Sequence, residues 1–140
     1  MSHEHDFLTA YVLPAARVAS REIAAALSPL GLAPAQYAVL DLLGREGDMR
    51  PAQIARRLDI ETSTTTNTLN RTEKGGWIER RTDPNNSRMV VISLSPKGKA
   101  VLADAREAVH SVEIKVADGE YEGDLNGARE ILKKVITELR

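Results

Sequence analysis

The chain has 140 residues, no cysteine and a formal net charge of −1, so it is long enough to bury one hydrophobic core without covalent cross-links. The absence of cysteine excludes disulfides, thiolate metal ligands and a cysteine nucleophile. No apolar run approaches the ~18 residues of a membrane span, and the polar, acidic first residues are unlike a signal peptide. We therefore expect a cytoplasmic protein with no membrane partner.

The charge is unevenly distributed along the chain. Residues 45–100 contain eleven Lys or Arg and seven Asp or Glu, a local charge of +4, whereas residues 1–44 carry −2 and residues 101–140 carry −3. A basic middle segment favours contact with a polyanion. Chance clustering explains a shift of this size equally well, so the charge has weight only beside the motifs that follow.

Apolar residues at helical spacing predict a first helix over about residues 7–30, which Ser28-Pro29 and Gly31 bring to an end. Pro14 lies inside this stretch and predicts either a kink or a separate first turn. Pro34 fits the first position of a second helix that stops at Gly47.

A short third helix is predicted over residues 51–58, and a fourth runs to about Lys74 with Thr62 or Ser63 as its N-cap. Gly75-Gly76 ends the fourth helix. A helical wheel gives it an inner face of Thr65, Thr68, Leu69 and Thr72. Its outer face and flanks are short, polar and uncharged to basic, and consist of Ser63, Thr64, Thr66, Asn67, Asn70, Arg71 and Lys74.

The residues after Gly76 change from helical to alternating spacing. Residues 77–82 and 89–94 read as two strands, and residues 83–88 between them are turn formers. Residues 77–94 are therefore predicted to form a β-hairpin whose tip carries Asn86, Ser87 and Arg88.

Two helices are predicted after the hairpin. Ser95 is the expected N-cap and Pro96 the first position of a long helix, which Asp118-Gly119 breaks. Both helices carry narrow apolar seams that need a partner, and a second copy of the chain is the simplest one. The seams are Leu102, Ala105, Val109, Val112 and Val116, then Leu125, Ala128, Ile131 or Leu132, Val135 and Leu139.

The order helix, turn, polar helix and basic hairpin is typical of a winged helix-turn-helix. Asn side chains can bond adenine, Ser and Thr can bond bases or phosphates, and a helix N-terminus attracts phosphate. Arg88 at the hairpin tip can enter a narrow minor groove. Taken alone, the helix could also be a solvated face and Arg88 an ordinary exposed arginine, but together they favour binding of double-stranded DNA.

Several of these stretches are similar to one protein family. The segments Leu58–Asn67, Glu73–Arg80, Asp83–Arg88 and Val91–Gly98 resemble the MarR family of bacterial transcriptional regulators, most specifically in "EKGGWIERR" and "SLSPKG". The resemblance implies a mainly α (α+β) fold, with a winged helix-turn-helix over residues 34–96 and dimerisation helices over 1–31 and 97–140. It further implies a homodimer, usually a repressor, that releases DNA when a small, often aromatic and anionic, effector binds.

This chain departs from the family pattern on its fourth helix. The family usually has Val at the position of Thr65 and Leu at those of Thr68 and Thr72, so these threonines must bond backbone carbonyls or leave the helix loosely packed. If Thr72 faces the core, Thr72→Leu should stabilise the domain. The family usually has Arg where this chain has Asn67, which favours an adenine contact there.

A candidate effector site is indicated by a few arginine and aromatic side chains. Those that suit an aromatic carboxylate are Tyr11, Arg17, Arg21, Tyr37 and Trp77, although residues such as Tyr37 and Trp77 more often belong to the core. His110 and Glu113 could share a metal, but two ligands are too few to assign one, and nothing marks a cofactor or an enzyme active site. A winged helix that binds protein instead of DNA is the alternative reading.

Overall fold

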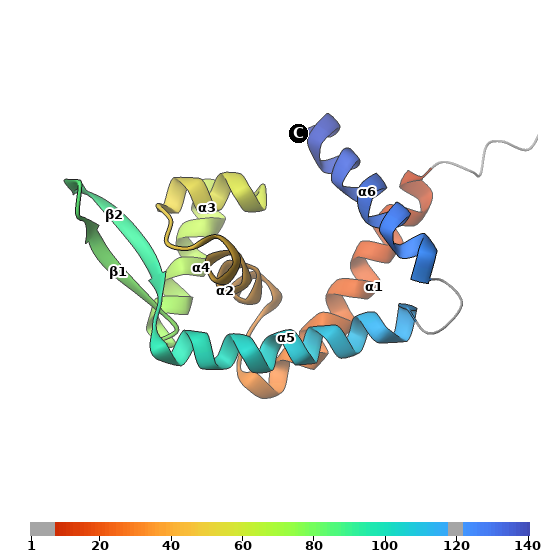
Figure 1. Ribbon diagram of the computed structural model, residues 1–140, viewed down its shortest axis with the longest axis horizontal. Helices are drawn as coiled ribbons and strands as arrows, with labels where there is room; N and C mark the ends of the chain where they lie inside the picture. Colours follow the sequence, from red (N-terminus) through yellow and green to blue (C-terminus); the bar gives the residue numbers. More distant parts are fainter. Residues whose placement is uncertain (1–7, 118–121) are drawn as a thin grey trace, which may run out of the picture.

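The computed structural model describes residues 8–117 and 122–140. Figure 1 shows α2, α3, α4 and a β-hairpin gathered on one side, and α5 running from them toward the end where α1 and α6 lie. This mainly helical arrangement with a two-stranded antiparallel sheet confirms the predicted fold class. The elements are α1 (Thr9–Leu27), the 3-10 helix η2 (Ser28–Leu30), α2 (Pro34–Glu46), α3 (Pro51–Leu58), α4 (Thr62–Lys74), β1 (Ile78–Asp83), β2 (Asn86–Leu94), α5 (Pro96–Ala117) and α6 (Glu122–Leu139).

The hydrophobic core lies where α2 meets α4, the base of the hairpin and the first half of α5. Its fully buried side chains include Leu27, Leu40, Ile54, Leu69, Ile78 and Ile92. No single helix of the described part is long and apolar enough to cross a membrane. Taken together, the bent helix pair Thr9–Leu30 and Pro34–Glu46 meets the length and composition of a membrane span.

The first three helices follow the predicted boundaries closely. Pro34 and Pro51 open α2 and α3, and Gly31 with φ of 75° closes η2. α1 continues through Pro14 as one helix, so the alternative of a separate first turn is wrong. Phe7, at which the predicted first helix begins, lies outside the described residues.

The N-terminus of α4 differs from the prediction. Its N-cap is Glu61, which makes no side-chain cap bond, rather than Thr62 or Ser63. Asp59 adopts the left-handed conformation (φ of 55°) and the Ile60 N–H bonds the Ala55 carbonyl, so the chain reverses quickly and Thr62 is already helical. The hydroxyls of Thr65 and Thr66 donate backward, to the carbonyls of Glu61 and Thr62 at 3.0 and 2.9 Å.

The inner face of α4 is confirmed. Thr65, Thr68 and Thr72 are buried beside Leu69. Each threonine hydroxyl donates to the carbonyl four residues earlier, at 3.0, 2.9 and 2.6 Å respectively. These bonds satisfy the buried hydroxyls, which is the first of the two alternatives that the sequence left open.

Thr72→Val is expected to raise the free energy of unfolding by about 1 kcal/mol. The side chain is fully buried, and valine keeps its shape while removing a hydroxyl that is costly to bury. Leucine at this position would add volume as well as remove the hydroxyl. Valine removes the hydroxyl at nearly constant volume, so its effect on stability is not mixed with overpacking. Denaturant unfolding measures the change, with the exposed Thr66→Val as control. A loss of stability in the Thr72 variant alone would show that the hydroxyl's bond outweighs its burial cost.

The hairpin covers nearly the predicted residues, but its second strand is longer and its connection shorter than predicted. The strands pair from Ile78 with Leu94 to Asp83 with Asn86, with an irregularity between Thr82 and Asp83. Only Pro84 and Asn85 connect them, so the predicted six-residue tip is wrong and residues 86–88 belong to β2. The Asp83 carboxylate accepts the Asn85 N–H at 2.9 Å, which stabilises this short connection.

The start of α5 is confirmed in detail. The Ser95 hydroxyl accepts the Gly98 N–H at 2.9 Å as N-cap and donates to the Gly76 carbonyl at 2.5 Å. Of the predicted seam, Leu102, Ala105 and Val109 are buried, whereas Val116 is 68% exposed. The predicted break at Asp118-Gly119 lies outside the described residues.

Candidate nucleic-acid interface

The outer face of α4 is exposed over its whole length. All seven residues that the helical wheel placed there are exposed, namely Ser63, Thr64, Thr66, Asn67, Asn70, Arg71 and Lys74. The opposite face holds α4 in the core through Leu69 and the three threonines. The helix therefore presents a polar surface on a rigid support, next to the projecting hairpin (Figure 1).

The charges around α4 are arranged so that cations remain available. Glu73 is the acidic residue within the helix, and its Oε1 lies 3.1 Å from Nε of Arg80 on β1. Arg71 and Lys74 have no ion pair within the part of the chain that the structure describes. The exposed face is consequently positive near its C-terminal end.

Arg80 was not among the residues that the sequence singled out. Besides pairing with Glu73, it donates from Nη2 to Oδ1 of Asn70 at 2.8 Å. These contacts connect β1 to two successive turns of α4. Strand alternation alone could not reveal them, because it does not say which helix lies against the strand.

Two ion pairs hold the hairpin on the body of the protein. Arg50 donates to the Asp83 carboxylate at 2.8 Å, and Arg81 contacts Asp48 at 3.2 Å. The hydrogen bond from Arg50, with that from the Asn85 amide, lowers the pKa of Asp83 below its usual value. The acidic group near the hairpin tip is thereby neutralised by an arginine of the body.

The outer part of β2 carries the predicted hairpin residues. Asn86, Ser87 and Arg88 are exposed, and the Asn86 side-chain oxygen accepts the Arg88 N–H at 3.1 Å. Among the described residues Arg88 has no acidic partner within ion-pair distance. Its guanidinium is thus a free cation on a projecting element.

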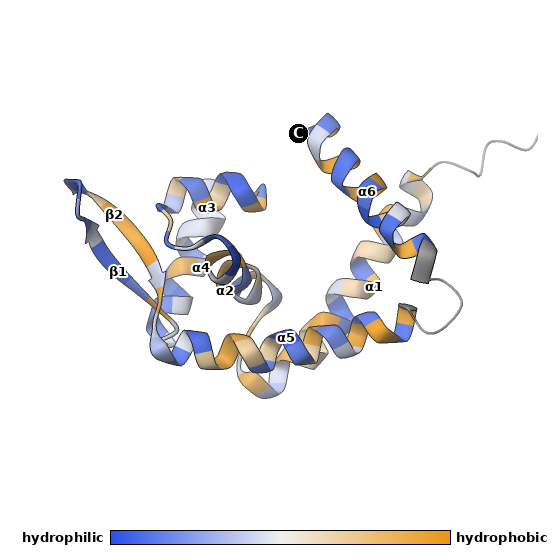
Figure 2. Cartoon of the chain, viewed as in Figure 1, coloured by the Kyte–Doolittle hydropathy of each residue, from blue (hydrophilic) through white to orange (hydrophobic). Residues whose placement is uncertain are grey.

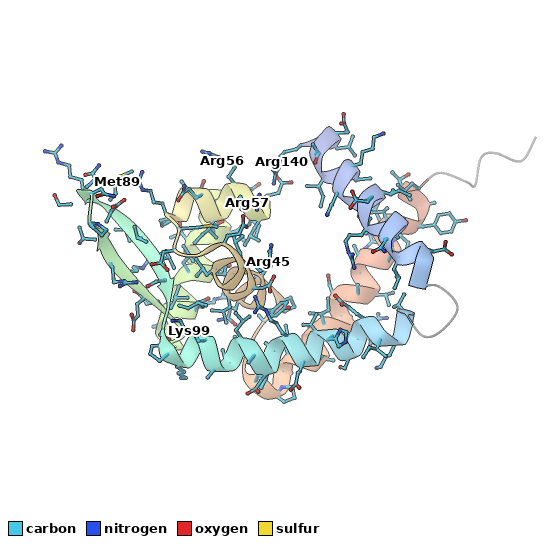
Figure 3. The ribbon with its side chains drawn as sticks, in the orientation of Figure 1. Arg45, Arg56, Arg57, Met89, Lys99 and Arg140 are labelled. Carbon is cyan, nitrogen blue, oxygen red and sulfur yellow. The ribbon has the colours of Figure 1, made fainter. Side chains whose placement is uncertain are left out.

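The end of α6 reaches the turn between α3 and α4. Arg140 donates from Nη2 to the Arg56 carbonyl at 2.9 Å, and its Nε lies 3.4 Å from Oδ1 of Asp59. Figure 3 shows Arg140 directed toward α3, on which Arg56 and Arg57 lie. The last helix and the helix-turn-helix are therefore in contact within one chain.

The five predicted effector residues are distributed over four environments. Tyr11 lines an apolar hollow of α1 and α6, and Arg17 and Arg21 are exposed farther along α1. Tyr37 lines a second hollow with Arg106 and His110 of α5, and burial, with help from Asp41, raises its pKa. Trp77 packs at the start of α5, where the Lys97 ammonium lies 5.4 Å from its ring centroid.

The His110 and Glu113 pair lies on the exposed surface of α5. Nδ1 of His110 is 3.9 Å from Oε2 of Glu113, and both side chains are more than two-thirds exposed. No group of three metal-ligating side chains occurs within residues 8–117 and 122–140. The pair therefore has the geometry of a solvated helix pair.

Comparison with known proteins places this arrangement in a family. The model of the MarR family matches residues 32–90, from just before α2 into β2. YwoH of Bacillus subtilis, an uncharacterized HTH-type transcriptional regulator, is 30% identical over 92 residues, which are 66% of this chain and 67% of YwoH. The chain belongs to the MarR family.

Other MarR relatives match over different lengths. The multiple antibiotic resistance protein MarR of Salmonella typhimurium is 35% identical over 75 residues, 54% of this chain and 52% of that protein. The chain thus spans about half the length of this curated MarR relative.

Solved structures establish the MarR fold over nearly the whole chain. The transcriptional repressor CouR bound to a 23-mer DNA duplex has a TM-score of 0.87 at 23% identity, covering 97% of this chain and 96% of CouR. Apo MarR from E. coli has a TM-score of 0.78 at 24% identity, covering 92% and 96%.

Proposed function

We propose that this MarR-family chain is a homodimeric, sequence-specific DNA-binding regulator of transcription, and a repressor that a small ligand releases. One observation carries the proposal: α4 buries its threonine and leucine face and exposes a Ser/Thr/Asn/Arg/Lys face beside a projecting hairpin. We assign no enzymatic activity, since members of this family are regulators, and we place the protein in the cytoplasm, where bacterial DNA is accessible.

The DNA-contacting roles follow from position on α4. Base edges in the major groove would be contacted by Asn67, Asn70 and Thr66. Phosphates would be bound at the helix N-terminus by Ser63 and Thr64. Arg71 and Lys74 add phosphate contacts near the other end.

The hairpin serves as the wing in this proposal. Asn86, Ser87 and Arg88 would reach the neighbouring minor groove, where the Arg88 cation is attracted by the negative potential. Residues 34–96 are then the DNA-binding region.

The regions 1–31 and 97–140 would form the dimer interface. Large apolar side chains lie exposed on α1 and α6, for example Leu13 at 58%, Ile136 at 53% and Leu139 at 78%. Figure 2 shows apolar residues along these helices at the end of the molecule away from the wing. Exposed apolar surface of this extent calls for a partner, and a second copy supplies the same surface in return.

A small aromatic anion is the proposed class of effector. The solved structures include CouR from Rhodococcus jostii RHA1 bound to p-coumaroyl-CoA, which supports ligand control in a protein of the same fold. The side chains to test for effector binding in the proposed dimer are Tyr11, Arg17 and Arg21 of one protomer and Tyr37 and Trp77 of either protomer.

Fluorescence anisotropy with the DNA immediately upstream of the protein's own gene tests the proposal. We expect specific binding over a scrambled duplex, two chains per site, and affinity that falls steeply with salt. Arg88→Ala should weaken binding about tenfold and reduce the salt slope by about 1, because one cation leaves the DNA.

The control is Lys115→Ala, which removes one exposed cation from α5 and should leave the affinity unchanged. If the protein binds neither duplex at low salt, the DNA-binding role is wrong and a protein-binding winged helix becomes the better explanation.

A further inference from the structure

Asn70 and Asn67 both lie on the exposed face of α4, but their amides are in different situations. The Asn70 oxygen accepts a hydrogen bond of 2.8 Å from Nη2 of Arg80. We propose that Arg80 fixes the Asn70 amide with its oxygen toward β1 and its NH₂ group turned away from β1, so that the amide presents its N–H donors to DNA, which makes Arg80 a positioning residue for sequence specificity. This inference rests on the proposed DNA-binding function.

The orientation of the amide follows from the chemistry of its partner. A guanidinium carries five N–H donors and no acceptor, so only the oxygen of an asparagine side chain can face it. Turning the Asn70 amide by 180° would oppose its NH₂ group to the guanidinium N–H. The oxygen therefore points to β1, and the NH₂ group points away from it.

The Arg80 side chain is itself held in place. Its Nε donates to Oε1 of Glu73 at 3.1 Å, one helical turn beyond Asn70. A planar guanidinium with two bonded edges keeps a defined direction. Glu73 also neutralises the charge of Arg80, so the function of this arginine here is geometric rather than electrostatic.

An amide whose oxygen is held toward β1 is expected to read a different base from an amide that can rotate. Bidentate recognition of adenine needs an oxygen that accepts from N6 and an NH₂ that donates to N7. With its oxygen held at Arg80, Asn70 has donors left for guanine N7 and O6 or thymine O4, while the N6 amino group of adenine opposes it. Asn70 is therefore expected to favour guanine or thymine.

Asn67 provides the internal comparison. Its side chain has no hydrogen-bond partner within the described part of the chain, so its amide can rotate to present both a donor and an acceptor. Asn67 is therefore the residue of this face that is suited to adenine. Two asparagines one turn apart thus read different bases, and the difference comes from the wing.

Selection of binding sites from a randomised duplex library tests the proposal. The variants are wild type, Glu73→Gln, the double variant Glu73→Gln with Arg80→Met, and Asn70→Ala. The double variant removes one negative and one positive charge, so its net charge equals that of wild type. Glu73→Gln alone keeps the Arg80 contact with Asn70.

At one position of each half-site, wild type and Glu73→Gln should select guanine or thymine over adenine by roughly five- to a hundredfold. The double variant should admit adenine there, and Asn70→Ala should lose the preference at that position. Positions read by Asn67 should stay the same in all four proteins.

Each outcome separates the two proposals. If wild type enriches no sequence and binds no duplex, the DNA-binding function itself is wrong. If wild type enriches a site, but the double variant and Asn70→Ala enrich the same one, the regulator stands and the role of Arg80 is refuted. Circular dichroism melting of each variant shows that the selected proteins are folded.

Discussion

Replacing Gly98 with alanine is expected to lower the free energy of unfolding by roughly 3 kcal/mol, at the upper end for overpacking. A Cβ at this position would lie 1.9 Å from the carbonyl oxygen of Trp77. That oxygen also accepts the Ser95 N–H at 3.0 Å, so the first turn of α5 rests directly on the backbone that enters β1. The three nearest atoms are all backbone atoms of Trp77, so the methyl group has no flexible side chain there to displace.

Gly127→Ala is the matched control, because it makes the same change within α6. A Cβ there meets nothing within 4 Å, so alanine should stabilise the helix by up to about 1 kcal/mol through its higher helix propensity. Thermal and denaturant unfolding of both variants measure the difference. Equal stability of Gly98→Ala and wild type would mean that α5 does not need its close approach to Trp77.

Leu132→Arg is expected to convert the proposed dimer into monomers and to weaken DNA binding by about a hundredfold or more. Leu132 is 49% exposed in a single chain and lines the apolar hollow between α1 and α6. An arginine buried there by a second copy would lack a partner for its charge, which is strongly unfavourable. A monomer would then contact one half-site instead of two.

Sedimentation velocity gives the oligomeric state, and anisotropy gives the DNA affinity of the same samples. Ala52→Arg adds the same charge at an exposed position of α3, outside the two regions proposed for the dimer interface, and should remain dimeric. A dimeric Leu132→Arg variant with normal affinity would place the interface elsewhere.

Periodicity and capping residues predicted most of the fold. Pro34, Pro51 and Ser95-Pro96 mark helix starts because proline fits the first turn and serine caps it, and all three lie where expected. The inner face of α4 was also predictable, since four residues at helical spacing share one side even when three of them are threonine.

Features that depend on contacts between elements were not predictable in the same way. The position of the α4 N-cap depends on how sharply Asp59 turns the chain, and the length of the strands depends on the Asp83–Asn86 pairing. The Arg80 contact with Asn70 joins residues ten positions apart in a helix and a strand. Hydrophobic pattern carries no information on such pairs of exposed polar groups.

We expect α4 to enter the major groove of DNA in two copies, which cleavage from a tethered iron chelate can show. Because the chain has no cysteine, Ser63→Cys creates a single attachment site for an iron chelate at the start of α4. Ser111→Cys on α5 is the control. Cleavage of a bound operator duplex by the Ser63→Cys conjugate at two places about one helical turn apart, ~34 Å, with none by the Ser111→Cys conjugate, is the expected result. Binding of the duplex with no cleavage from Ser63→Cys, or with equal cleavage from both conjugates, would mean that α4 does not lie in the major groove.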